Sequence, residues 1–101
     1  MVKHVVLWKL DDSYSTDEKR KICSEFRQKL YGLKNDIPVL LNIEVYLKSD
    51  AASGSNFDIM LDSVFNSFDD LNTYQLHRSH QKVVDYVRSL KSQRAAIDFM
   101  F

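Results

Sequence analysis

The chain has few of the residues that form cross-links, metal clusters or phosphate-binding loops. Its one cysteine, Cys23, excludes an internal disulfide and a zinc site built from several cysteines. Its two glycines, Gly32 and Gly54, stand alone and do not form a dinucleotide-binding or P-loop fingerprint. The sequence therefore predicts neither a cofactor nor a disulfide framework.

The chain also has no excess of either charge and no long apolar run. Lys plus Arg and Asp plus Glu both number 14, so the formal net charge is zero. This balance is not the footprint of a nucleic-acid-binding protein, and it removes one barrier to self-association. No apolar run reaches membrane-spanning length, and the stretch before Lys9 is too short for a signal peptide. We expect one cytoplasmic domain over residues 1–101, without nucleic-acid or membrane partners.

Four strands and two helices are predicted from hydrophobic periodicity. The strands are expected at residues 2–10, 39–48, 57–66 and 93–101. A capping box of Ser15 and Glu18 begins the first helix, and Pro38 follows its end. Ser67 begins a second helical region, which runs to about Leu90. The order β-α-β-β-α-β predicts an α+β fold, with a four-stranded antiparallel sheet and both helices on one face.

The two faces of this sheet are expected to differ. The core under the helices is expected to contain Phe26, Leu30, Leu61, Val87 and Ile97. The other face would carry the apolar residues Val5, Leu7, Met60, Val64, Ala96 and Met100. It would also carry the charged residues Lys3, Lys9, Glu44, Asp58, Asp62, Arg94 and Asp98. Exposed apolar patches usually mark an interface, so a two-fold homodimer is expected; a monomer with an open amphipathic sheet is the alternative.

Residues 68–90 cannot bury all their apolar side chains as one straight helix. One apolar stripe contains Phe68, Leu71 and Tyr74. A second stripe, about 150° away around the helix, contains Leu76, His80, Val83, Val87 and Leu90. The simplest solution is a break near residues 77–79, with Ser79 capping a helix that starts at His80.

This break lies among the most reactive side chains of the sequence. His4 shares a strand face with Trp8, and His80 shares a helix stripe with Val83, so both imidazoles can face one space between sheet and helices. Tyr74 joins them if the break turns it inward. Two imidazoles and a phenol suit a small aromatic or polyketone-like ligand. Histidine can move a proton next to a carbonyl, and a tyrosine hydroxyl can hold the enolate oxygen.

Two other interpretations of these residues remain open. His4, Tyr74 and His80 can form a buried hydrogen-bonded cluster that only fixes the helix break. His77 and His80 also raise the possibility of zinc, but the break turns them in different directions and no convincing fourth ligand is present. No metal site is therefore expected.

Three segments resemble a known family. They are Val2-Lys3-His4-Val5-Val6, Phe57-Asp58-Ile59-Met60-Leu61 with the following Phe65, Ser67 and Asp70-Leu71, and Tyr74-Gln75-Leu76-His77-Arg78-Ser79-His80. They are similar to the stress-responsive A/B barrel (Dabb) domain, whose signature is Tyr-x-x-His-Pro-x-His. The resemblance covers essentially the whole chain and implies a ferredoxin-like monomer that forms a dimeric α+β barrel. Arg78 stands where the family usually has proline.

The resemblance also implies chemistry. A plant polyketide cyclase of this family uses a strand histidine, a helix histidine and a tyrosine in an aldol condensation, and by motif these are His4, His80 and Tyr74. Phe26 stands near the position of a further tyrosine of that enzyme. The remaining ligand contacts are expected from Trp8, Phe26, His77 and Val84. Three functions stay open: a small-molecule-binding homodimer, a structural or stress-responsive dimer without catalysis, and a polyketide-cyclase-like lyase.

Overall fold

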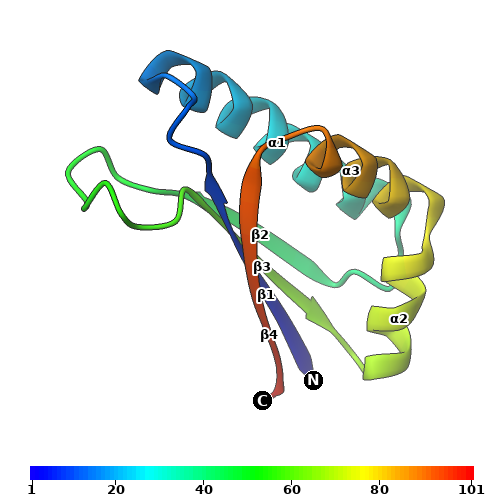
Figure 1. The fold of residues 1–101 in the computed structure, drawn as a ribbon. Coiled ribbons are helices and arrows are strands. Elements are labelled where there is room, and N and C mark those ends of the chain that lie inside the picture. Colours follow the sequence, from blue (N-terminus) through cyan, green and yellow to red (C-terminus); the bar gives the residue numbers. More distant parts are fainter.

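The computed structural model describes residues 1–101 as one antiparallel sheet covered on one face by helices (Figure 1). The elements are β1 (Val2–Leu10), α1 (Thr16–Asp36), β2 (Asn42–Leu47), β3 (Ile59–Phe65), α2 (Phe68–Leu76), α3 (Arg78–Arg88) and β4 (Ser92–Met100). The strand order is β2-β3-β1-β4. This is the predicted ferredoxin-like fold, with the second helical region divided in two. None of the three helices has the combination of length and apolarity that a membrane crossing requires.

Local sequence signals set the bounds of α1. The Ser15 side chain accepts the Glu18 amide hydrogen, and the Glu18 side chain accepts the Ser15 amide hydrogen, which confirms the capping box. Ile37 ends the helix, its amide donating to the Leu33 carbonyl at 3.0 Å. The buried stripe of α1 is Cys23, Phe26, Leu30 and Leu33. This stripe lies against the sheet and forms the centre of the core.

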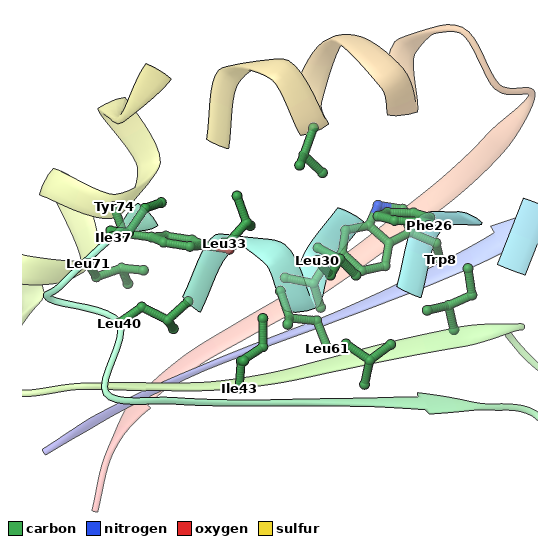
Figure 2. Packing of buried hydrophobic residues seen from close by; sticks show 14 of the residues in the cluster. Trp8, Phe26, Leu30, Leu33, Ile37, Leu40, Ile43, Leu61, Leu71 and Tyr74 are labelled. Carbon is green, nitrogen blue, oxygen red and sulfur yellow. The ribbon is translucent and has the colours of Figure 1, made fainter. Parts of the chain in front are cut away.

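The main core lies between α1 and the strands β1, β2 and β3 (Figure 2). Phe26, Leu30 and Leu61 are buried in it, as predicted. Trp8 and Phe26 lie side by side, with ring centroids 4.6 Å apart. Val87 packs against this cluster but is only partly buried. The prediction for Ile97 is wrong, because 59% of its surface is exposed.

The error at Ile97 reflects the orientation of β4. The β1–β4 register pairs Val5 with Ile97 and His4 with Asp98. Directly paired residues of antiparallel strands lie on the same face, so β4 turns Ile97 to the open face. Its helix-side face consists of Arg94, Ala96, Asp98 and Met100, all of which were predicted on the open face. Because β4 is an edge strand with exposed residues on both faces, its hydrophobic pattern does not determine its orientation.

Asp58 also differs from its predicted place on the open face. It immediately precedes β3 and is buried. Its Oδ2 accepts the Leu10 amide hydrogen at 2.7 Å, and its Oδ1 lies 3.2 Å from Lys48 Nζ. Because β3 begins only at Ile59, the alternation of that strand does not extend to Asp58.

The break between α2 and α3 is confirmed, but the residue that caps it is His77. Its amide donates to the Tyr74 carbonyl at 3.2 Å, and its Nδ1 accepts the Ser79 amide hydrogen at 3.0 Å. Ser79 therefore lies inside α3, and the prediction that it caps this helix is wrong. The Ser79 hydroxyl instead donates to Asp36 Oδ2 at the end of α1, with 3.0 Å between the two oxygens. One histidine thus ends α2 and begins α3.

Candidate functional site

A cavity of about 470 Å³ lies between α3 and the β1–β4 half of the sheet. Five residues singled out from the sequence line it: His4, Trp8, Tyr74, His80 and Val84. Further apolar lining comes from Val6, Leu30, Leu61, Val83, Val87 and Leu90, and the remaining residues are Arg88, Ser92 and Arg94.

Two residues expected at the site do not line the cavity. Phe26 is completely buried, between Trp8 and Tyr86. His77 lies at the helix joint, where its Nδ1 is used for capping. Phe26 therefore supports the wall formed by Trp8, and His77 sets the angle at which α3 passes over the sheet.

His4 is buried and is held by a carboxylate on the neighbouring strand. Its Nδ1 is hydrogen-bonded to Asp98 Oδ1, and the two residues are direct cross-strand partners. An ionised carboxylate only accepts hydrogen bonds, so Nδ1 carries the hydrogen and Nε2 is the second, free nitrogen. Sequence reasoning missed Asp98 because it assigned the wrong face to β4. One signal in the sequence could have found it: a carboxylate lies opposite His4 only if Asp98, and not Ile97, faces the helices.

His80 is held in one tautomer by the backbone. Its Nδ1 lies 3.0 Å from the Gln75 carbonyl oxygen, which can only accept, so Nδ1 carries the hydrogen. Burial lowers the pKa of His80 below its ordinary value of 6.5. The hydrogen bond to Gln75 raises this pKa, whereas the charges of His4 and Arg94 lower it, and the net shift is downward. His80 is therefore neutral at pH 7, with a lone pair on Nε2.

The helix break makes this arrangement possible. In a continuous helix the Gln75 carbonyl would accept the amide hydrogen of Ser79, four residues on. That amide instead donates to His77 Nδ1. The Gln75 carbonyl is thus free to accept from His80 Nδ1 and, at 2.8 Å, from Gln81 Nε2. The local sequence around residue 77 therefore orients the imidazole of His80.

Tyr74 brings an unpaired hydroxyl to the same place. Its ring centroid lies 4.5 Å from that of His80 and 6.3 Å from that of His4. The residue is fully buried and its hydroxyl has no hydrogen-bond partner. Burial raises the pKa of Tyr74, so the hydroxyl stays protonated at neutral pH. It is therefore a donor without an acceptor.

Trp8 contributes a second buried donor of this kind, because its Nε1 also lacks a partner. More than about 90% of buried polar groups in folded proteins are hydrogen-bonded. Three buried side-chain polar atoms lack a partner here, and two of them belong to residues that line this cavity. The arrangement can donate hydrogen bonds to a ligand oxygen and accept one proton at His80 Nε2. No group of three or more His, Cys, Asp or Glu side chains is arranged to hold a metal ion.

The fold and the sequence around the helix break define the class of this protein. The topology is that of a ferredoxin-like α+β domain with an interrupted second helix. The Stress responsive A/B Barrel Domain family matches residues 2–101, and the chain belongs to this family.

Known relatives agree with this assignment. The stress-response A/B barrel domain-containing protein DABB1 of Arabidopsis thaliana is 30% identical over 108 residues, which cover 99% of this chain and 47% of that protein. This chain therefore spans about half the length of that relative. A crystal structure from Bacteroides fragilis, described as a dimeric protein of unknown function with a ferredoxin-like fold, is 33% identical. Its TM-score is 0.89, with 99% of this chain and 95% of that chain covered.

The fold is shared with an enzyme. Hydroxynitrile lyase from Passiflora edulis has a TM-score of 0.73 and 13% identity, over 99% of this chain and 92% of that chain. At this level of identity, the similarity concerns the fold alone.

Proposed function

We propose that the protein is a homodimer that binds a small aromatic or polyketone-like carbonyl compound in the cavity beneath α3. The observation that carries this proposal is the unpaired, fully buried hydroxyl of Tyr74, whose ring lies against that of His80. The cavity volume of about 470 Å³ falls in the usual range for small-molecule sites. A carbonyl oxygen would accept from Tyr74, and the apolar lining would hold a flat or aliphatic body.

The test compares two tyrosine variants. Thermal-shift and calorimetric titrations with aryl ketones and 1,3-diketones are made on wild type, Tyr74→Phe and the control Tyr86→Phe. Tyr86 does not line the cavity, and its hydroxyl has only a long contact of 3.5 Å to Glu25. Tyr74→Phe is expected to weaken binding about tenfold, equivalent to one hydrogen bond of about 1.4 kcal/mol.

Stability separates this proposal from a purely structural His/Tyr cluster. Tyr74→Phe removes a hydroxyl that has no partner, so the variant should melt at or above the wild-type temperature. Tyr86→Phe should keep wild-type affinity. If wild type binds none of the ketones and both Tyr74→Phe and His80→Ala lower the melting temperature, the cluster is structural and the ligand proposal is wrong.

The homodimer is proposed to form through the open face of the sheet. Ile97 and Phe99 are exposed on this face, where Ile97 lies opposite Val5 of β1. Leu7 of β1 lies on the same face, opposite Ala95. The Bacteroides fragilis relative is described as dimeric, which supports the same assembly here. An apolar face of this kind is stabilised when a second copy covers it.

Sedimentation velocity at micromolar concentration tests the dimer. Ile97→Asp should give monomers, because burying an unpaired charge in an interface costs several kcal/mol. Leu76→Asp is the matched control: Leu76 ends α2 and is also exposed, but it does not lie on the sheet. It should leave the dimer intact. A monomeric wild type, or a dimeric Ile97→Asp, would refute this interface.

A second candidate function is catalysis of proton transfer next to the ligand carbonyl. The neutral tautomer of His80 favours it, because Nε2 can remove a proton while Tyr74 donates to the enolate oxygen. Wild type should accelerate exchange of the α-hydrogens of a bound aryl ketone with D2O, measured by NMR. His80→Ala should abolish the acceleration, whereas Tyr86→Phe should not. If wild type binds the ketone but does not accelerate exchange of its α-hydrogens, the catalytic proposal is wrong and the binding function remains.

A further inference from the structure

We infer that the ligand of this cavity carries a carboxylate at the end remote from its carbonyl, and that Arg94 and Trp8 bind this carboxylate. The inference rests on the proposed ligand site and names the class of its ligand: an aryl or aliphatic keto acid. It comes from the β1–β4 register, which brings Arg94 to the helix side of the sheet.

Trp8 and Arg94 are placed to act together. They are direct cross-strand partners and both line the cavity. Trp8 is 6% exposed, and its Nε1–H is buried without an acceptor. Arg94 takes part in none of the ion pairs of the chain. A guanidinium and an indole N–H are both donors only, so the group that satisfies them has acceptor oxygens, and a carboxylate matches the guanidinium best.

The charges of the cavity fix the direction in which such a ligand would lie. Asp98 lies beside His4, four residues further along β4 from Arg94, which is about 13 Å along a strand. The His4 end already holds the Asp98 carboxylate, which is paired with His4, whereas the guanidinium at the Trp8 end has no partner and attracts an anion. Between them the paired residues are Val6 and Ala96, which are apolar. The site therefore has a carbonyl end, an apolar middle and an anion end.

The other cation of the cavity is less suited to this role. Arg88 lines the rim, but its guanidinium lies 3.8 Å from Asp85 on the same helix. Both of those side chains are largely exposed, so they stay solvated and partly neutralise each other. Arg94 is the cavity cation that has no carboxylate partner.

The experiment measures the preference for an acid over its neutral amide. Calorimetric titrations use 8-oxo-8-phenyloctanoic acid and its primary amide, which differ only in the charged group. Wild type should bind the acid about tenfold more tightly than the amide, as a charge-assisted hydrogen bond provides. Arg94→Gln should bind both equally, and Arg94→Lys should keep part of the preference.

Two further variants make the result specific. Arg27→Gln removes an exposed guanidinium of α1 that does not line the cavity, and it should keep the full preference. Trp8→Phe should weaken binding of the acid more than binding of the amide, because only the acid offers the indole N–H a charged acceptor. Arg94 is exposed, so its variants should fold like wild type, which a thermal melt verifies.

The outcomes distinguish this inference from the proposed function. Equal affinity of wild type for acid and amide would overturn the carboxylate inference and leave the carbonyl site standing. A preference that survives in Arg94→Gln would also overturn it, because another group would then bind the anion. If the aryl ketones bind and neither long-chain probe binds, the carboxylate inference is wrong and the proposed function stands. If none of these compounds binds, both proposals are wrong.

Discussion

The two halves of the sheet are packed in opposite ways. On β2 and β3, the side chains of Ile43, Val45, Ile59, Leu61 and Phe65 on the helix side are all buried. On β4, every residue after Ser92 is exposed, although this strand pairs along its whole length with the central strand β1. The difference arises because α1 packs on the first half, whereas α3 buries only Val83 and passes over a cavity.

This contrast separates stability from binding. The half under α1 holds most of the large, fully buried apolar side chains (Figure 2). The half under α3 holds unpaired donors and charged groups, which would be costly in a dry core but are tolerated beside an open cavity. Changes in the first half should therefore have the largest effect on folding, whereas changes in the second half should also alter the pH response and ligand binding.

The largest effect is expected in the packed half. Phe65→Ala should lower the free energy of unfolding by about 3–5 kcal/mol, because it leaves a cavity in a filled core. Phe68→Ala, at the exposed first position of α2, should cost less than about 1 kcal/mol. Urea denaturation measures both. A loss below about 1 kcal/mol for Phe65→Ala would remove the contrast between the two halves.

An intermediate effect is expected in the open half. Asp98→Ala should lower the free energy of unfolding by about 1–3 kcal/mol, because it leaves Nδ1 of the buried His4 without its acceptor. Asp85→Ala breaks an exposed pair with Arg88 at 3.8 Å and should cost less than about 1 kcal/mol. Equal losses for the two variants would mean that solvent replaces Asp98 at His4 without cost.

The sequence predicts the packed half better than the open half, for a physical reason. Phe26, Leu30 and Leu61 follow from periodicity because one side of their element is dry and the other wet. On β4 no such contrast exists, so the alternation wrongly predicts Ile97 in the core and Arg94 and Asp98 on the open face. Only pairing with β1 decides the orientation of this edge strand, and pairing is not encoded in its alternation.

The candidate site shows the same limit. The two stripes of residues 68–90 predict a break, and the structure contains it. The stripes do not identify the residue that caps α3. A histidine Nδ1 can accept an amide hydrogen as a serine hydroxyl does, and His77 is the N-cap of this helix. The placement of His4, Tyr74 and His80 at one cavity was expected from the sequence, but the acceptor that orients His80 is a backbone carbonyl. Such a group has no sequence signal.

The smallest effect expected concerns the pH response of the open half. Burial lowers the pKa of His80 in the folded protein below 6.5, so the unfolded chain binds a proton first as the pH falls. The neutral imidazole therefore contributes stability that is complete above about pH 6.5 and is lost as the pH falls towards the folded pKa. Because the ring is only half buried and stays partly solvated, we expect this change to be the smallest of the three.

His80→Gln isolates this contribution, because glutamine does not titrate and its amide can still donate to the Gln75 carbonyl. The free energies of unfolding of wild type and His80→Gln are measured between pH 7.5 and 5, and their difference should shift against wild type only below about pH 6.5. An NMR titration of the His80 ring should give a midpoint below 6.5. A midpoint above 6.5 would mean that the folded protein stabilises the imidazolium, and His80 would then act as an acid towards a ligand carbonyl rather than as the base inferred from its tautomer.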